Sequence, residues 1–233
     1  MNPEARRGMR ECYAAQWRMD LPKWKAGLSG EQLVHVESVE QDDEFRDVLR
    51  QRCDRNSPPA GALTSAFLLV AAAHFNGRLT LFSALNAHDV GRYGWEPGGF
   101  FAELWVWPER KIGGYAVDLS AMLIAQDRPG VEAVHDNWHC EIEGSQHDDG
   151  PAVQRDRQRH RAIQGRAPLV RYSATEVLAD IFGCAEQAWR SCELVADSLM
   201  LACRGASERA HSPPTADVCA ALAFTRNPPH DPV

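Results

Sequence analysis

Apolar residues recur at helical spacing in two segments of the first third of the chain. In residues 31–53, valines, leucines and one phenylalanine follow roughly a 3.6-residue period, which predicts one or two helices. Residues 62–75, ALTSAFLLVAAAHF, are apolar on nearly every side and predict a buried helix. The intervening NSPPAG is typical of a break between elements. Residues 1–30 show no clear period, so their pattern predicts no element.

From residue 101 the pattern changes to aromatic and β-branched runs, which are typical of strands. Two such runs, 103–107 and 114–125, precede a DRPG turn, and residues 131–144 then form a returning strand that we expect to be interrupted near Asp136 and Asn137. A short strand is also allowed at RLTLFSAL. The remaining expected elements are a polar helix at 152–163, a strand at 167–174 and one long helix after the capping-box pair Ser173 and Glu176.

This order of elements predicts an α/β fold with a mixed central sheet flanked by helices. We expect an N-terminal helical extension over residues 1–55 and the α/β domain over residues 56–205. Residues 206–233 contain paired prolines twice and predict a flexible C-terminal tail.

Composition narrows the functional classes. The 233 residues contain no apolar run long enough to span a membrane and no export signal, so we expect a cytoplasmic protein without membrane contact. Seven cysteines without CxxC spacing favour reduced thiols. A net charge of −7 argues against a broad phosphate-binding surface. The local exception is residues 154–171, with six arginines and one acid, which are either a nucleic-acid contact or a solvated helix face.

Two carboxylates alternate with apolar residues in WHCEIEG, residues 138–144. A hairpin centred on Pro129–Gly130 would place Asp118 opposite Glu141 and Ala116 opposite Glu143, provided that no bulge shifts the register. The three acids would then share one sheet face. The opposite face would hold the apolar residues Val117, Leu119, Cys140 and Ile142.

Opposed residues lie about 5 Å apart, where two like charges repel by roughly 3 kcal/mol at an effective dielectric of about 20. Either one carboxyl takes up a proton or a hard divalent cation lies between the two. The alternative is that Glu141 and Glu143 line the solvent side of a strand, paired with arginines of the following helix.

Four motifs in order resemble a known family. They are Ile112–Asp118 (IGGYAVD), Glu141–His147 (EIEGSQH), Asp156–Arg159 (DRQR) and Val170–Ser173 (VRYS), the last followed by Val177. Together they are similar to small nuclease-like domains related to the very short patch repair endonuclease. These domains belong to the PD-(D/E)XK restriction-endonuclease-like superfamily. The resemblance covers residues 103 to about 190 and implies a restriction-endonuclease-like core.

The resemblance implies roles for individual residues. Asp118 and Glu141 would hold Mg²⁺ or Mn²⁺, while Glu143 and His147 would assist catalysis by orienting water or moving protons. Arg155, Arg159 and Arg171 would contact the nucleic-acid backbone. For Arg159 and Arg171 the preferred alternative is a structural salt bridge to Asp156 or Glu176.

This chain departs from the family at the first helix, where the family often carries Ser-Pro-x-Glu. Here the sequence reads Ser57–Ala60 (SPPA), without an acid. Glu103, Glu44 and Asp43 are possible substitutes, and the spacing selects none of them. Glu143 is also one methylene longer than the aspartate usual at its position.

The predicted function is a Mg²⁺-dependent endonuclease that hydrolyses phosphodiester bonds, with DNA as the expected target. The alternative is a catalytically inactive nuclease-fold module that binds nucleic acid or a protein. A third possibility is a structural subunit that docks a protein partner through its N-terminal third. A zinc site of Cys53, His139, Cys140 and His147 fits no closed tetrahedral spacing, and no P-loop, GxGxxG or GxSxG motif is present.

Overall fold

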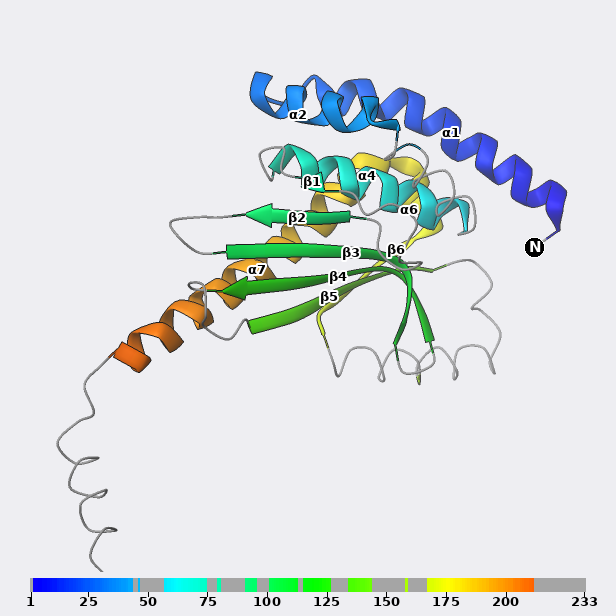
Figure 1. Ribbon diagram of the computed structural model, residues 1–233. Helices are drawn as coiled ribbons and strands as arrows, with labels where there is room; N and C mark the ends of the chain where they lie inside the picture. Colours follow the sequence, from blue (N-terminus) through cyan, green and yellow to red (C-terminus); the bar gives the residue numbers. More distant parts are fainter. Residues whose placement is uncertain are drawn as a thin grey trace, which may run out of the picture.

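A computed structural model of the chain describes residues 2–43, 46, 57–74, 79–80, 91–95, 101–112, 115–126, 134–143, 158 and 167–211. Its fold is mixed α/β, with a mixed sheet flanked by helices, as the sequence predicted (Figure 1). The helices in the described ranges are α1 (Pro3–Lys25), α2 (Gly30–Gln41), α4 (Pro58–His74), α6 (Ala174–Ala179) and α7 (Ile181–His211). None of the helices in these ranges combines the length and the apolar content that a membrane span needs.

The sheet has six strands that lie side by side in chain order. They are β1 (Leu79–Thr80), β2 (Gly91–Trp95), β3 (Phe101–Ile112), β4 (Tyr115–Gln126), β5 (Val134–Glu143) and β6 (Leu169–Ser173). Neighbouring strands are antiparallel except β5 and β6, which are parallel. The helix predicted at 152–163 lies outside the described residues except for Gln158, which is helical.

The register between β4 and β5 is the one that the sequence predicted. Leu119 pairs with Cys140 and Ala125 pairs with Val134, so paired positions follow the register expected for a turn centred on Pro129–Gly130. The ladder runs through Asp136 and Asn137 without a break, so the interruption expected there is wrong.

One face of the sheet packs against α4 and α7. Trp138 of β5 is fully buried, stacks on Phe67 of α4 with ring centroids 5.4 Å apart, and donates from Nε1 to Ser191 Oγ of α7 at 3.1 Å. Its cross-strand neighbour Ala121 and the pair Leu119 and Cys140 belong to the same buried cluster. In Figure 1, α7 crosses behind the strands that carry these residues.

Helix α1, for which the sequence predicted no element, is anchored by aromatic contacts. Trp17 and Trp24 lie 5.0 and 4.7 Å, between ring centroids, from Phe182 of α7. Tyr13 is buried, and its hydroxyl donates to the carbonyl of Ala174 at 2.6 Å. Most of the remaining α1 side chains are exposed, which is why an apolar period is hard to see.

One predicted helix start differs from the structure, and another is confirmed. Helix α4 begins at Pro58 rather than at residue 62, because proline fits the first helical turn and the Ser57 hydroxyl accepts from the Ala60 amide at 3.4 Å. The capping box of Ser173 and Glu176 is confirmed, and both of its hydrogen bonds are present.

The helix that follows is not continuous. Helix α6 ends at Ala179, and Asp180 then caps a new helix by accepting from the Gly183 amide at 2.8 Å. That helix, α7, continues to His211, beyond the start that the sequence predicted for the tail at residue 206. Residues 212–233 lie outside the described residues.

Candidate active site

The sheet face opposite α4 and α7, here called the polar face, carries polar side chains on three neighbouring strands. Alternation puts Ser120 and Asp118 of β4 on this face, because Leu119 and Ala121 point into the helix-covered core. The same alternation puts His139, Glu141 and Glu143 of β5 there. The predicted segregation of acids and apolar residues onto opposite faces therefore agrees with which side chains join the apolar core.

The two carboxylates proposed to hold a metal lie at the point where β4 meets the end of β5. Extending the ladder by one residue beyond Leu119 and Cys140 brings Asp118 opposite Glu141. The Asp118 carboxylate also accepts from the backbone amide of Ile142 at 2.8 Å, which fixes it against β5. Asp118 is partly exposed, whereas Glu141 retains only 4% exposure. A carboxylate this buried must be paired, protonated or bound to a cation.

Arg171 of β6 occupies the position beside Glu141 in the parallel register. Its Nη1 forms an ion pair with Oε1 of Glu143, which lies two residues further along β5. The side chain of Arg171 is 25% exposed and that of Glu143 is 47% exposed. Arg171 therefore lies next to both carboxylates of β5.

This ion pair corrects two alternatives drawn from the sequence. Arg171 forms an ion pair with Glu143, whereas the Glu176 carboxylate, the partner expected for Arg171, accepts from the Ser173 amide in the capping box. The expectation that Glu141 and Glu143 both line the solvent side is wrong for Glu141, which is buried. It holds for Glu143, whose arginine partner comes from β6 and not from the following helix.

The polar face is closed at its centre and open at one end. Ser120 and His139 are buried, at 0% and 2% exposure. Beyond Asp118 and Glu141, towards the start of β4, the side chains of Ala116, Lys111 and Glu143 are exposed. The open end of the polar face is therefore the Glu143 end.

A buried Ser–His pair adjoins the carboxylates on the closed side. Ser120 Oγ and His139 Nδ1 are 2.8 Å apart, and the His139 amide donates to the Pro168 carbonyl at 2.9 Å. Burial and the nearby Arg110 guanidinium lower the pKa of His139 to about 4, against a smaller opposing effect of a hydrogen bond at the Trp138 backbone. The imidazole is therefore neutral near pH 7.

Arg110 is itself held in place on this side of the site. Its guanidinium lies 4.5 Å above the Trp107 ring centroid, and its Nη1 donates to Asn137 Oδ1 at 2.9 Å. The sequence pattern indicates His139 only as a member of the rejected zinc site. The alternation that selected Glu141 also selects His139, two residues earlier in the same strand.

Several residues expected at the site lie elsewhere or outside the description. His147, Arg155, Arg159 and Glu44 are outside the described residues, so their roles stay predictions. Ala60, at the position of the family's helix glutamate, is 1% exposed in the helical core, so the start of α4 brings no carboxylate there.

The substitutes proposed for that glutamate can also be placed. Asp43 is highly exposed and pairs with Arg46, so nothing links it to the site. Glu103 lies in β3 opposite Ile124, six residues along β4 from Asp118, which is about 20 Å at the rise of a strand. Instead, the β3 register brings Glu109 to the position across from Asp118, because Pro108 pairs with Leu119 and Arg110 with Val117.

Two adjacent carboxylates fit a hard divalent cation. Among the described residues, no group of three or more His, Cys, Asp or Glu side chains is arranged to hold a metal. Mg²⁺ needs no such group, because it is usually held by one or two carboxylates together with water and substrate phosphate oxygens. Asp118 and Glu141 supply two such carboxylates, one of them reachable from solvent.

Comparison of the chain with protein-family models, with curated proteins and with solved structures found no match.

Proposed function

We propose that this protein is a metal-dependent nuclease whose divalent cation is held by Asp118 and Glu141. The observation that carries the proposal is the register of β4 and β5, together with the Ile142 amide bonded to Asp118, which brings the two acids to one point of the sheet. The resemblance of the surrounding motifs to PD-(D/E)XK nucleases supports the same assignment.

Each side chain of the site has a distinct task in this proposal. Asp118 and Glu141 hold Mg²⁺, which when bound polarises the phosphoryl group and lowers the pKa of a coordinated water. Arg171, oriented by Glu143, binds a phosphate oxygen of the substrate. The exposed end of the polar face at Glu143 and Lys111 admits the strand. The resemblance alone supports the catalytic role of His147 and the choice of DNA as the substrate.

The buried Ser120 and His139 pair supports the carboxylates rather than reacting. Both side chains are almost inaccessible, and the neutral imidazole adds no positive charge beside Glu141. The pair occupies the next same-face positions of β4 and β5 and closes that side of the polar face.

Isosteric substitutions test the proposal without disturbing the backbone. In Asp118→Asn the side-chain oxygen can still accept from Ile142, and Glu141→Gln keeps its volume. Both should lose Mg²⁺- or Mn²⁺-dependent cleavage of single- and double-stranded DNA and RNA, while circular dichroism shows that both variants are folded. Glu37→Gln, on the exposed side of α2, is the matched control and should cut normally. Cleavage that persists in both site variants, or in chelator, would remove the assignment.

Two observations favour a second candidate, a nuclease-fold module that binds nucleic acid without cutting. Glu143 is already neutralised by Arg171, and Ala60 replaces the acid of the first helix. Calorimetric titration separates the two functions. A nuclease takes up Mn²⁺ with a heat that disappears in Asp118→Asn, whereas a module that has lost its metal shows no heat that depends on this carboxylate.

A further inference from the structure

Helix α1 is basic in a chain that is acidic overall. It carries six Lys or Arg and three Asp or Glu, against a net charge of −7 for the whole chain. Of its acids, Asp20 is buried and accepts from Gln16 at 2.9 Å. Among its basic residues, Lys25 is paired with Glu40 of α2, and Lys23 Nζ lies 3.8 Å from Asp20 Oδ1. The other four of the six basic residues are arginines.

Three of these arginines share one side of the helix. Arg7, Arg10 and Arg18 are exposed, and with Ala14 they follow the spacing i, i+3, i+7 and i+11, which places them along one stripe. We call these four residues the basic stripe. The stripe is about 16 Å long at the rise of an α-helix. The exposed acid Glu11 directly follows Arg10 in the chain.

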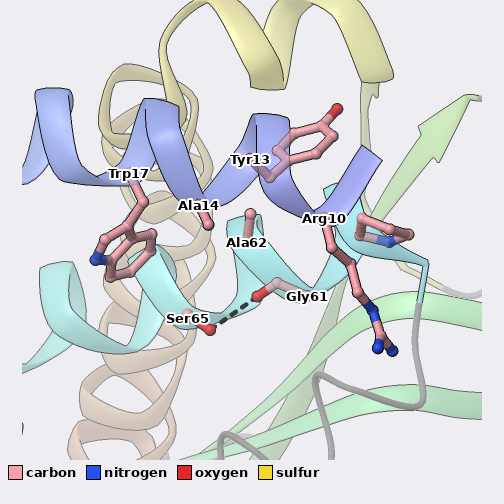
Figure 2. A pocket seen from close by; sticks show the side chains of 8 residues that line it. Arg10, Tyr13, Ala14, Trp17, Gly61, Ala62 and Ser65 are labelled. Carbon is pink, nitrogen blue, oxygen red and sulfur yellow. Dashed lines mark hydrogen bonds between the residues drawn. The ribbon is translucent and has the colours of Figure 1, made fainter. Parts of the chain in front are cut away.

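The basic stripe borders a pocket between α1 and α4, with a volume of about 280 Å³. Figure 2 shows Trp17 at one end of the pocket and Arg10 at the other, with Ala14 and Ala62 between them. The floor is made of small residues, and Ser65 turns its hydroxyl back to the Gly61 carbonyl at 2.8 Å. The lining residues are Arg10, Tyr13, Ala14, Trp17, Pro58, Gly61, Ala62 and Ser65.

The pocket and the candidate active site lie at the same end of the sheet. Tyr13, which lines the pocket, bonds to the carbonyl of Ala174. Ala174 directly follows Ser173, which pairs with Glu143 at the open end of the polar face. The N-terminal turns of α1 extend past the other helices at this end (Figure 1).

We propose that the basic stripe and this pocket form a second nucleic-acid contact, in which the arginines hold phosphates and the pocket takes an unpaired base. Charge complementarity selects the partner, because exposed arginines on one helix side attract a polyanion even when the net charge is negative. The Trp17 ring and the small residues at the bottom of the pocket suit the flat face of a base. In duplex DNA the bases are stacked inside the helix, so only an unpaired base can enter the pocket. The inference rests on the proposed function only in taking nucleic acid as the partner.

Charge removal tests the basic stripe. The full chain is titrated in EDTA, so that nothing is cut, with a fluorescent single-stranded oligothymidine over a range of salt concentrations. Arg7→Gln with Arg10→Gln should weaken binding about tenfold at low salt and lower the salt slope by about 1.4, since each contact to a single strand contributes about 0.7. Lys23→Gln, exposed on α1 but away from the stripe, is the matched control and should bind like the wild type.

Filling the pocket tests the base contact separately. Ala14→Phe should weaken single-strand binding about tenfold, the loss expected for one stacked base, and leave duplex binding unchanged. Ala15→Phe makes the same change at the next exposed position of α1, which does not line the pocket, and should have no effect. Circular dichroism confirms that each variant is folded.

Several outcomes would overturn the inference. One is wild-type affinity in the double arginine variant, and another is an equal effect of the two phenylalanines. A third is a wild-type chain that binds neither oligonucleotide at low salt, which would leave a protein segment or a second copy as the occupant of this face. The proposed nuclease activity is tested separately. A chain that binds nucleic acid through α1 but never cleaves it would refute the nuclease activity and leave the second contact standing.

Discussion

The coupling between Asp118 and Glu141 can be measured directly with a double-mutant cycle of Asp118→Asn, Glu141→Gln and the double variant. In chelator the two carboxylates face each other without a shared cation, so each single substitution relieves the same repulsion and the second relieves no more. Each single substitution also changes the interaction of that acid with Arg171 and with other neighbours, and the register alone does not give the size of this change. The cycle cancels these contributions and leaves the coupling between the two acids.

The register sets the size of the expected coupling. Opposed side chains lie about 5 Å apart, which gives a repulsion of about 3 kcal/mol at an effective dielectric of about 20. Water at the partly exposed Asp118 reduces this towards about 1 kcal/mol. We therefore expect a repulsive coupling of about 1–3 kcal/mol in chelator.

Divalent cation should shift the coupling towards attraction. At a cation concentration of about 100 times the dissociation constant, binding stabilises the folded chain by about 2.7 kcal/mol. Either single substitution should remove most of that gain, so the coupling in cation should be more attractive than the coupling in chelator by up to about 2.7 kcal/mol. The assay is urea unfolding of the four proteins in EDTA and in Mg²⁺ or Mn²⁺. A coupling within the additivity error of about 0.5 kcal/mol in both conditions would refute the shared site.

Two further predictions concern stability. The folded-state pKa of His139 is about 4 against an ordinary 6.5, so the unfolded chain binds the extra proton first. The contribution of His139 to the free energy of unfolding should be complete above pH 6.5 and fall by at most about 3 kcal/mol as the pH drops to about 4. Urea unfolding at several pH values measures this dependence, and His139→Gln should flatten it. Gly183→Ala would bring a Cβ within 2.1 Å of Asp180 Oδ2 and should cost about 1 kcal/mol by displacing this cap of α7. Gly8→Ala, with no atom near its Cβ, should stabilise α1 by up to about 1 kcal/mol, and thermal melts that move both variants in the same direction would contradict the capping argument.

The sequence alone determined the local geometry of the hairpin. A turn signal at DRPG and strict alternation on both sides are enough to set which residues oppose one another, because a strand exposes successive side chains on opposite faces. The pairing of Leu119 with Cys140 confirms that register, and Asp118 and Glu141 are the next residues beyond this last pair of the ladder. The capping box at Ser173 is equally local and was equally predictable.

Long-range packing decided what the sequence could not. The partner of Glu143 is Arg171, brought alongside by a parallel strand that returns after a long crossover, and no spacing rule ties those two positions together. Helix α1 lacked an apolar period because a few aromatic contacts with α7 anchor it, whereas most of its surface meets solvent.

The burial of Glu141 is also a property of the assembled fold. Its neighbour in the alternation, Glu143, has the same residue type and the same face, yet one is 4% exposed and the other lies at the open end. Side-chain direction follows from the two-residue period of the strand, which is written in the sequence. Solvent access depends on what the rest of the chain places over each position, which only the tertiary structure decides.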